Sequence, residues 1–218
     1  MINLYNLDCL PAMKAMPDKA YELAIVDPPY GIGFDGEVPS MVLHPRSTKW
    51  KDPHLTGYLR KEWDKTPPPQ EYFSELIRVS TDQIIFGGNH FTLPQSSGWI
   101  FWDKVNGDFS LGDGELAWTS FNRAVRQFTF IWHGFRRGEK VIRIHPTQKP
   151  VRLYEWLLQN YAKPGDRILD THGGSGSICI ACDILGFDLD WYEIDADYFQ
   201  AAKERLERHQ RQQVLDLK

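Results

Sequence analysis

Four short apolar segments of this chain each end at an acidic residue. INLYNL precedes Asp8, LAIV precedes Asp27, RIL precedes Asp170 and LDWY precedes Glu193. Segments of this length, followed by turn or helix signals, predict strands buried on both faces of a parallel sheet. Open α/β sheets bind ligands just outside the carboxyl ends of their strands, so we expect the four carboxylates to gather at one ligand-binding edge.

The remaining segments predict an α/β fold with a mostly parallel central sheet and helices on both faces. The sequence predicts helices over 11–20, 71–80, 150–163, 177–186 and 196–213. The third has apolar residues at helical spacing, opens with Pro150 and stops before Pro164 and Gly165. Further strands are predicted over 83–86, 98–102, 115–120 and 127–132. The last three have less helix between them, which leaves antiparallel pairing open.

Length and composition indicate one globular domain over residues 1–218. The chain is 42% hydrophobic and 25% charged, which excludes disorder of the whole chain. It shows neither an apolar run long enough to span a membrane nor a basic leader, so we expect a cytoplasmic protein. Its three Cys predict free thiols, and Cys179 and Cys182 are interpreted as packed thiols within a helix rather than zinc ligands.

The charge of the chain is unevenly distributed. Its net charge is −4, yet residues 123–152 carry eight Lys or Arg and a single acid, Glu139. Such a cluster is compatible with a nucleic-acid surface and equally with a solvated face. The nucleic-acid-binding candidates within it are Arg123, Arg126, Arg136, Arg137, Lys140 and Arg143.

The segment LDTHGGSGS (169–177) reads as a strand end, a glycine-rich turn and a helix start. Glycines let a backbone pass close to a ligand, and a helix N-terminus offers free N–H groups. Glu193 follows at about the spacing at which nucleotide-binding folds place their ribose-binding acid. The spacing does not match a full G-x-G-x-x-G, so a plain structural turn remains an alternative.

The tetrapeptide DPPY (27–30) is the more specific signal. Two prolines stiffen the backbone and remove N–H donors, which leaves carbonyls free to accept hydrogen bonds. The Asp27 carboxylate also accepts, and Tyr30 offers an aromatic face. These groups suit a flat ligand that carries an NH₂ group.

Four motifs together resemble the S-adenosylmethionine-dependent DNA amino-methyltransferases, which methylate adenine N6 or cytosine N4. They are DPPY after a strand, HPTQKP at 145–150, LDTHGGSGS, and YEID at 192–195. The motif order, catalytic motif first and glycine loop last, is similar to the circularly permuted beta subclass. The resemblance covers nearly the whole chain and implies a Rossmann-like class I methyltransferase fold.

The resemblance also implies roles for individual residues. Asp27 accepts a hydrogen bond from the target amine, the Pro28 carbonyl accepts the second, Pro29 completes the motif and Tyr30 stacks on the base. Glu193 takes the ribose hydroxyls, and Lys149 lies near the methionine carboxylate. The full set implied to bind S-adenosylmethionine is Asp8, Cys9, Thr147, Lys149, Asp170, Thr171, Gly173, Ser175, Gly176, Ser177, Glu193 and Asp195.

The glycine segment departs from the usual LDPF-x-GSG-T of the family at three positions. Thr171 replaces Pro, His172 replaces an aromatic residue and Ser177 replaces Thr. Ser177 preserves the hydroxyl and His172 can still flank the cofactor, so we expect binding to be kept. A role for His172 as a catalytic base is disfavoured.

The family's adenine enzymes mostly carry Asp first in the DPPY motif, which favours the 6-amino group of adenine. A cytosine 4-amino or RNA adenine methyltransferase, or a non-catalytic nucleic-acid-binding relative, remains an alternative. Methylation at carbon 5 of cytosine is set aside, because it requires a cysteine nucleophile that usually follows Pro, and none of the three Cys does.

The resemblance implies double-stranded DNA as partner, S-adenosylhomocysteine as product, no metal and a bacterial or phage-encoded enzyme. It leaves open a homodimer and a cognate restriction endonuclease. Residues 31–69 are polar, lack a sustained period and are predicted to form a mobile DNA-contacting loop. Residues 103–143 are predicted to hold target-recognition insertions.

Overall fold

The structure, a computed structural model, describes residues 1–33, 61, 63–105, 112–132 and 143–216. Its strands are β1 (Ile2–Tyr5), β2 (Tyr21–Val26), β3 (Ser80–Phe86), β4 (Trp99–Asp103), β5 (Gly114–Thr119), β6 (Arg126–Thr129), β7 (Arg167–Asp170) and β8 (Asp188–Tyr192). Its α-helices are α1 (Cys9–Ala15), α2 (Gln70–Val79), α3 (Val151–Tyr161), α4 (Ser177–Leu185) and α5 (Ala196–Asp216).

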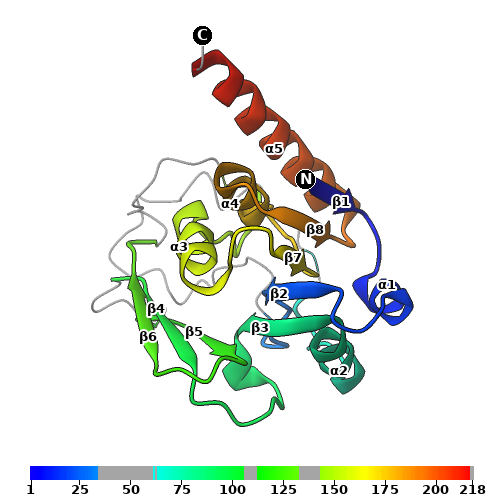
Figure 1. Ribbon diagram of the computed structural model, residues 1–218, viewed down its shortest axis with the longest axis vertical. Coiled ribbons are helices and arrows are strands. Elements are labelled where there is room, and N and C mark those ends of the chain that lie inside the picture. The colour runs from blue at the N-terminus through cyan, green and yellow to red at the C-terminus, as the bar shows by residue number, and fades with distance from the viewer. Residues whose placement is uncertain (34–60, 62, 106–111, 133–142, 217–218) are drawn as a thin grey trace, which may run out of the picture.

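All eight strands form one sheet in the order β1-β8-β7-β2-β3-β5-β4-β6 (Figure 1). The pairs from β1 through β3 are all parallel. Strand β5 runs antiparallel to both of its neighbours, and β6 is parallel to β4. The predicted mostly parallel sheet is therefore confirmed, and antiparallel pairing enters through β5.

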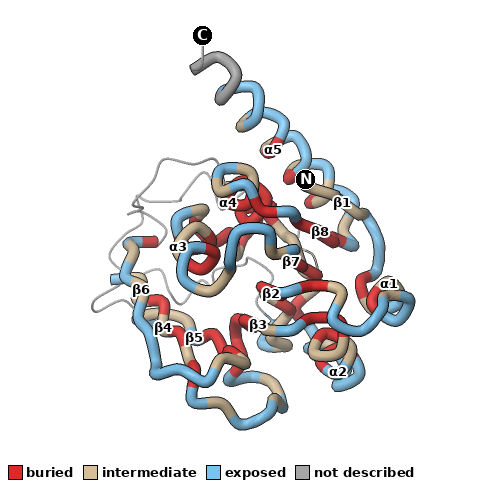
Figure 2. The backbone as a smooth tube through the Cα atoms, in the orientation of Figure 1, coloured by how far each residue is buried: buried red, intermediate tan, exposed pale blue. Residues whose placement is uncertain are grey.

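Helices cover both faces of the sheet, as predicted. Along β2, Leu23 and Ile25 pack in a core cluster with residues of α3, α4 and α5, whereas Ala24 and Val26 pack with residues of α1 and α2. Alternate side chains of a strand point to opposite faces, so a continuous apolar run serves both layers. Figure 2 shows the buried residues concentrated along the central strands.

Helix α1 begins earlier and ends earlier than the predicted helix over 11–20. Asp8 is its N-cap, and Oδ1 of Asp8 accepts a hydrogen bond from the N–H of Leu10 at 3.0 Å. The helix ends at Ala15 because Met16 precedes Pro17, and a residue before proline disfavours the helical conformation.

Helix α5 leaves the sheet and extends beyond the body of the molecule (Figure 1), and much of it is exposed (Figure 2). Within the described residues, no helix combines the length and the apolar character needed to cross a membrane.

Candidate active site

The four predicted strand-end acids lie along one edge of the sheet. Asp8, Asp27, Asp170 and Glu193 end or follow β1, β2, β7 and β8, which are neighbouring parallel strands. Burial raises the pKa of Asp170, and the negative charges of Asp27 and Glu193 raise it further, to about 8. Asp27, Asp170 and Glu193 are therefore close enough for their charges to interact.

Asp27 lies at the end of β2 and is tied to Tyr30. Oδ1 of Asp27 accepts a hydrogen bond from the Tyr30 hydroxyl at 2.7 Å, and Oδ2 forms an ion pair with Lys149. Burial raises the pKa of Asp27, and Lys149 opposes that rise. Pro28 is buried and Pro29 is half-buried.

The ring of Tyr30 packs on the segment 87–90. It stacks on His90 with a centroid distance of 5.1 Å and an interplanar angle of 11°. Gly87 has φ +66° at the N-cap of a 3-10 helix, and a Cβ at this position would lie 2.2 Å from Cε1 of Tyr30. The sequence left open whether GGNH is a plain turn or a wall of the pocket, and the structure places this segment in contact with the ring of Tyr30.

Asp64 holds the turn that follows DPPY. Its buried carboxylate accepts hydrogen bonds from the backbone N–H groups of Tyr30 and Gly31, at 2.7 and 2.9 Å. Its backbone carbonyl accepts another from the N–H of Gly33 at 2.9 Å. Sequence reasoning missed Asp64, because nothing in a polar segment indicates which acid folds back onto a distant turn.

Residues 34–60 and 62 of the predicted loop 31–69 lie outside the described residues. Lys61, which lies between these two gaps, forms an ion pair with Asp195 at 2.6 Å. Asp195 also accepts hydrogen bonds from two backbone N–H groups in the first turn of α5. Lys61 thus attaches the later part of this segment to Asp195, the last residue of the YEID motif.

The glycine loop between β7 and α4 is held by the end of β8. The N–H of Gly173 donates to the Tyr192 carbonyl at 2.8 Å, and the N–H of Gly174 donates to Oε2 of Glu193 at 2.7 Å. Oε1 of Glu193 accepts from the N–H of Asp195 at 2.8 Å. Burial raises the pKa of Glu193 although these N–H groups oppose the rise.

The two serines of the loop form hydrogen bonds with other residues of the protein. The Ser177 hydroxyl donates to the Lys149 carbonyl at 2.7 Å and accepts from Arg205 at 2.9 Å, while Arg205 also donates to the Ser175 carbonyl at 2.8 Å. Gly176 precedes α4 in the left-handed conformation. These contacts join α4, α5 and the HPTQKP segment around the loop.

Two of the three residues that depart from the family pattern contact Tyr72. The hydroxyls of Thr171 and Tyr72 are 2.7 Å apart, and Nδ1 of His172 lies 3.0 Å from the Thr171 hydroxyl. Burial lowers the pKa of His172 to about 4, so its ring is neutral near pH 7. His172 therefore presents an uncharged ring at the place where the family carries an aromatic residue.

The HPTQKP segment brings two further side chains to this edge. The Thr147 hydroxyl lies 3.1 Å from Nδ1 of His145, whose ring packs edge-on against Tyr198 at 4.3 Å. Burial and then the nearby Lys149 lower the pKa of His145 to about 3. His145 is thus a neutral packing residue.

The Lys149 ammonium has two carboxylate partners within the protein. It contacts Asp27 and Glu115, and Glu115 also pairs with Lys104. Although burial opposes ionisation, Lys104 and Lys149 lower the pKa of Glu115 to about 2. Glu115 was missed, yet a signal existed: the first residues of an antiparallel strand lie at the edge where parallel strands end.

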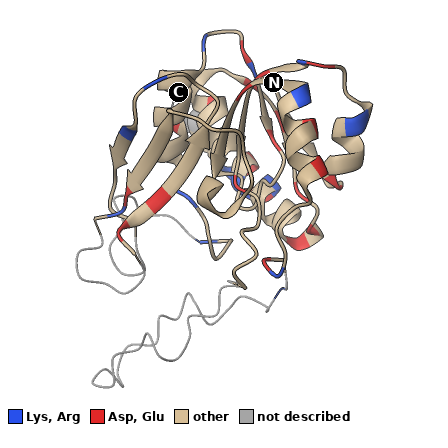
Figure 3. Cartoon of the chain, turned by 90° about the horizontal axis from the view of Figure 1, so that it is seen from below, with Lys and Arg blue, Asp and Glu red and all other residues tan. Residues whose placement is uncertain are grey.

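The basic candidates are spread out. Arg126 begins β6, which β3, β5 and β4 separate from β2. Arg123 donates to the Asn160 carbonyl at the end of α3, and both arginines line a cavity of about 370 Å³. Figure 3 shows Lys and Arg interspersed with Asp and Glu over the described elements. Arg143 is half-buried, and the remaining candidates lie outside the described residues: Arg136, Arg137 and Lys140.

The stretch predicted to hold target-recognition insertions, residues 103–143, contributes β5 and β6 to the central sheet. Residues 106–111 and 133–142 of this stretch lie outside the described part of the chain.

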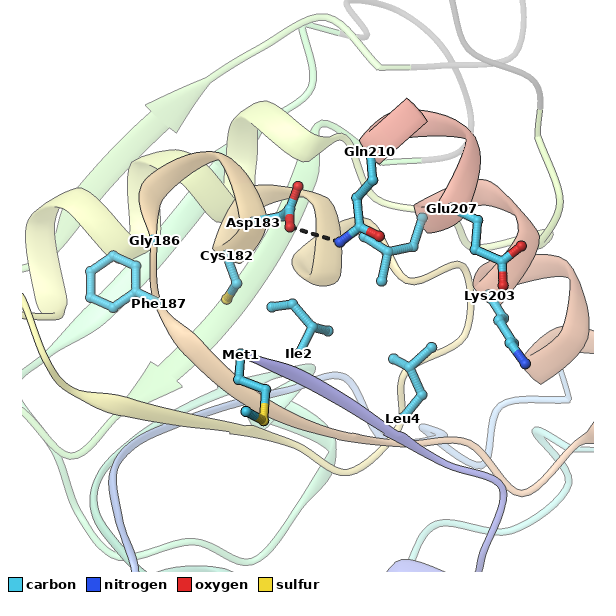
Figure 4. Close-up of a pocket in the computed structure, with 11 residues that line it drawn as sticks. Met1, Ile2, Leu4, Cys182, Asp183, Gly186, Phe187, Lys203, Glu207 and Gln210 are labelled. Atoms are coloured by element: carbon cyan, nitrogen blue, oxygen red, sulfur yellow. Dashed lines mark hydrogen bonds between the residues drawn. The ribbon is translucent and has the colours of Figure 1, made fainter. Parts of the chain in front are cut away.

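Another cavity, of about 380 Å³, lies between β1, α4 and α5. Figure 4 shows Ile2 of β1, Cys182 of α4 and Gln210 of α5 among the residues that line it. Gly186, just before β8, also lines it, so this cavity lies toward the amino ends of β1 and β8, away from the edge that carries the acids.

The three cysteines are buried free thiols, as predicted. Burial and then the charge of Asp8 raise the pKa of Cys9 to about 12, and burial also raises the pKa values of Cys179 and Cys182. All three are therefore protonated packing residues.

Asp170→Asn is expected to flatten the pH dependence of stability. The raised pKa of about 8 means that folded Asp170 keeps its proton where an unfolded Asp, with a pKa of about 3.9, has lost it. This contribution to stability is present at low pH and is lost as pH rises through about 8. The wild-type free energy of unfolding, measured in urea between about pH 5 and 9, should fall more steeply than that of the variant.

The control is the exposed Asp18→Asn, which should keep the wild-type slope. Parallel profiles for wild type and Asp170→Asn would show that Asp170 is ionised in the folded protein.

Comparisons with known proteins agree with this geometry. A family model described as DNA methylase, N6_N4_Mtase, matches residues 95–204, just over half of the chain. The type II methyltransferase M.HpaI of Haemophilus parainfluenzae is 24% identical over an alignment of 245 positions, gaps included. The alignment covers 92% of this chain and 72% of that protein.

Two solved structures share the fold. The crystal structure of the M1.HpyAVI–SAM complex aligns with a TM-score of 0.56 at 22% identity, covering 94% of this chain and 100% of that one. PvuII DNA methyltransferase, described as cytosine-N4-specific, aligns with a TM-score of 0.55 at 12% identity, covering 95% and 90% of the two chains. The predicted Rossmann-like class I fold is confirmed.

Proposed function

The chain belongs to the N6/N4 DNA methylase family, and on this premise we propose that it transfers a methyl group from S-adenosylmethionine to the 6-amino group of adenine in DNA. The observation that carries the proposal is the Asp27–Tyr30 pair at the end of β2, beside the glycine loop. An anionic acceptor next to an aromatic ring suits a flat base with an amino group.

The residues at the ends of β1, β7 and β8 fit S-adenosylmethionine. Each oxygen of Glu193 accepts one backbone N–H, so lone pairs remain for ribose hydroxyls. Leu7 and Ile194 are exposed apolar side chains beside the acids, and Asn6 joins their segments by donating to the Ile194 carbonyl at 3.2 Å. They offer an apolar surface for the adenine ring of the cofactor. When bound, the cofactor supplies the methyl group as a sulfonium.

The target amine is a weak nucleophile because its lone pair is conjugated with the ring. Asp27 and the Pro28 carbonyl would accept its two N–H groups and orient the lone pair toward the methyl group. The base must leave the duplex, which costs a few kcal/mol. Stacking on Tyr30, whose ring already pairs with His90, offsets part of that cost.

Adenine is proposed over cytosine because the motif begins with Asp27, the residue that the family's adenine enzymes mostly carry there. Contacts to DNA are proposed for the loop 31–69 and for the stretch 103–143, where each bidentate side-chain contact to a base discriminates by about 1–3 kcal/mol.

The test is to incubate the protein with DNA and deuterated S-adenosylmethionine, digest the DNA to nucleosides and identify the labelled product by mass spectrometry. We expect N6-methyldeoxyadenosine. Labelled N4-methyldeoxycytidine would replace the adenine assignment by the cytosine one, and label in RNA but not DNA would change the substrate. No labelled nucleoside at all would favour a non-catalytic relative. Sequencing the methylated DNA then gives the recognition sequence.

A further inference from the structure

Four charged side chains form a continuous chain at the proposed amine site. Lys149 forms ion pairs with Oδ2 of Asp27 and with Oε2 of Glu115, the latter at 3.1 Å. Lys104 pairs with the other oxygen of Glu115. Glu115 comes from β5, across β3 from β2, and lies outside every motif named above.

Both the backbone and the side chain of Lys149 are held by neighbouring residues. Its carbonyl accepts the hydroxyl of Ser177 at the start of α4, and its ammonium lies 4.6 Å from the centroid of the Phe86 ring. Its side chain is 4% exposed. A lysine ammonium sits on a flexible four-carbon stem, so one carboxylate alone does not define its position. Glu115 supplies the second anionic contact.

We propose that Glu115 is a positioning residue for Asp27, an inference that rests on the proposed role of Asp27 as acceptor of the target amine. Glu115 fixes the Lys149 ammonium against Oδ2 of Asp27. With Oδ2 held by Lys149 and Oδ1 by Tyr30, the carboxylate is held in one orientation, and each oxygen keeps a lone pair with which it would accept the target amine.

The charges support this role. Two carboxylates and two ammonium groups alternate along the chain, so the cluster carries no net charge. Breaking a buried ion pair by removing one partner leaves an uncompensated charge, so each member depends on the others. Lys104 is held in addition by the ring of Trp102, 4.7 Å from its Nζ. Glu115 is thereby placed between two fixed cations.

Glu115→Gln tests the role. If Glu115 holds the Lys149 ammonium against Asp27, the variant loses that contact, and Lys149 lowers the pKa of Asp27 more than Glu115 raises it. The acid limb of the kcat–pH profile should therefore move to higher pH. In Glu115→Gln, kcat should also fall by about 100-fold, since a misplacement of about 1 Å has this effect, with KM for the cofactor unchanged.

Glu75→Gln is the matched control, because Glu75 pairs with Arg78 on α2 and contacts none of the four charged groups. It should keep the wild-type profile. Loss of the Glu115 charge with Lys149 still in place would move the acid limb to lower pH, and this outcome would overturn the inference. An acid limb that coincides with that of wild type would overturn it as well.

A second measurement separates this inference from the proposed function. The ¹⁵Nζ resonance of Lys149 in the free protein, assigned with Lys149→Met, should be protected from exchange in wild type and lost or shifted in Glu115→Gln. An unchanged resonance would overturn the positioning role. A changed resonance in a protein that methylates neither adenine nor cytosine would support the positioning of Lys149 and would refute the proposed function instead.

Discussion

Asp27→Asn is expected to lower kcat for methyl transfer by about 100- to 1,000-fold, the range observed when one preorganised hydrogen-bonding group is removed from a reacting site. The variant keeps the size of the side chain but removes the anionic acceptor for the target amine. Lys149 retains Glu115 as a partner, so the substitution does not leave the buried ammonium alone. The Kd for S-adenosylmethionine should stay within about threefold, because the contacts of Glu193 do not involve Asp27.

Quenched assays measure kcat for methyl transfer, and calorimetry measures the Kd for the cofactor, so the two effects are observed separately. Asp18→Asn, which alters an exposed ion pair with Arg78, should change neither. If cofactor affinity fell in parallel with kcat, Asp27 would belong to the cofactor half of the site, and the assignment would be wrong.

The arrangement of the sheet was largely predictable because its signals are local. An acid ends or closely follows each of β1, β2, β7 and β8, and buried parallel strands have continuous apolar sequences, so the edge that carries the carboxylates follows from the chain itself. The orientation of β5 was left open, because pairing of β5 with β3 and β4 depends on contacts between distant segments. The start of α1 was misplaced because the cap formed by Asp8 was not recognised.

The motifs of the candidate site could be predicted from the sequence, whereas the residues that contact them could not. DPPY and the glycine loop carry their own turn chemistry, and the structure brings both to one edge. Asp64 reaches that edge only through tertiary contacts, which no local pattern encodes. Glu115 follows only from the antiparallel orientation of β5, which the sequence left open. The buried ammonium of Lys149 needs a counterion in the folded chain, and no pattern in the sequence indicates that Asp27 and Glu115 provide it.

Gly173→Ala is expected to damage the cofactor half of the site selectively. A Cβ at position 173 would lie 1.8 Å from Cε2 and 1.9 Å from Nε1 of Trp191, a ring that is fully buried. Either the loop or the indole must move. Overpacking of this kind destabilises a protein by about 1–3 kcal/mol, which urea unfolding should detect.

The same displacement should weaken cofactor binding more than it weakens the fold. The N–H of Gly173 is bonded to the Tyr192 carbonyl, and the next N–H is bonded to Glu193, so a shifted loop misplaces the acid proposed to hold the ribose. We expect the Kd for S-adenosylmethionine to rise by about 100-fold, equal to about 2.7 kcal/mol. Calorimetry on the folded variant, well below its unfolding midpoint, measures this value.

Gly186→Ala is the matched control, because nothing lies within 4 Å of a Cβ at position 186. Because Gly186 has φ +76°, alanine at this position should lower the free energy of unfolding by about 1 kcal/mol. Its cofactor affinity should therefore be normal despite a comparable loss of stability. Equal loss of affinity in both variants would mean that binding follows global stability, whereas loss in Gly173→Ala alone locates the cofactor against the loop. Together with Asp27→Asn, this outcome divides the edge of the sheet into a half that holds the methyl donor and a half that holds the amine.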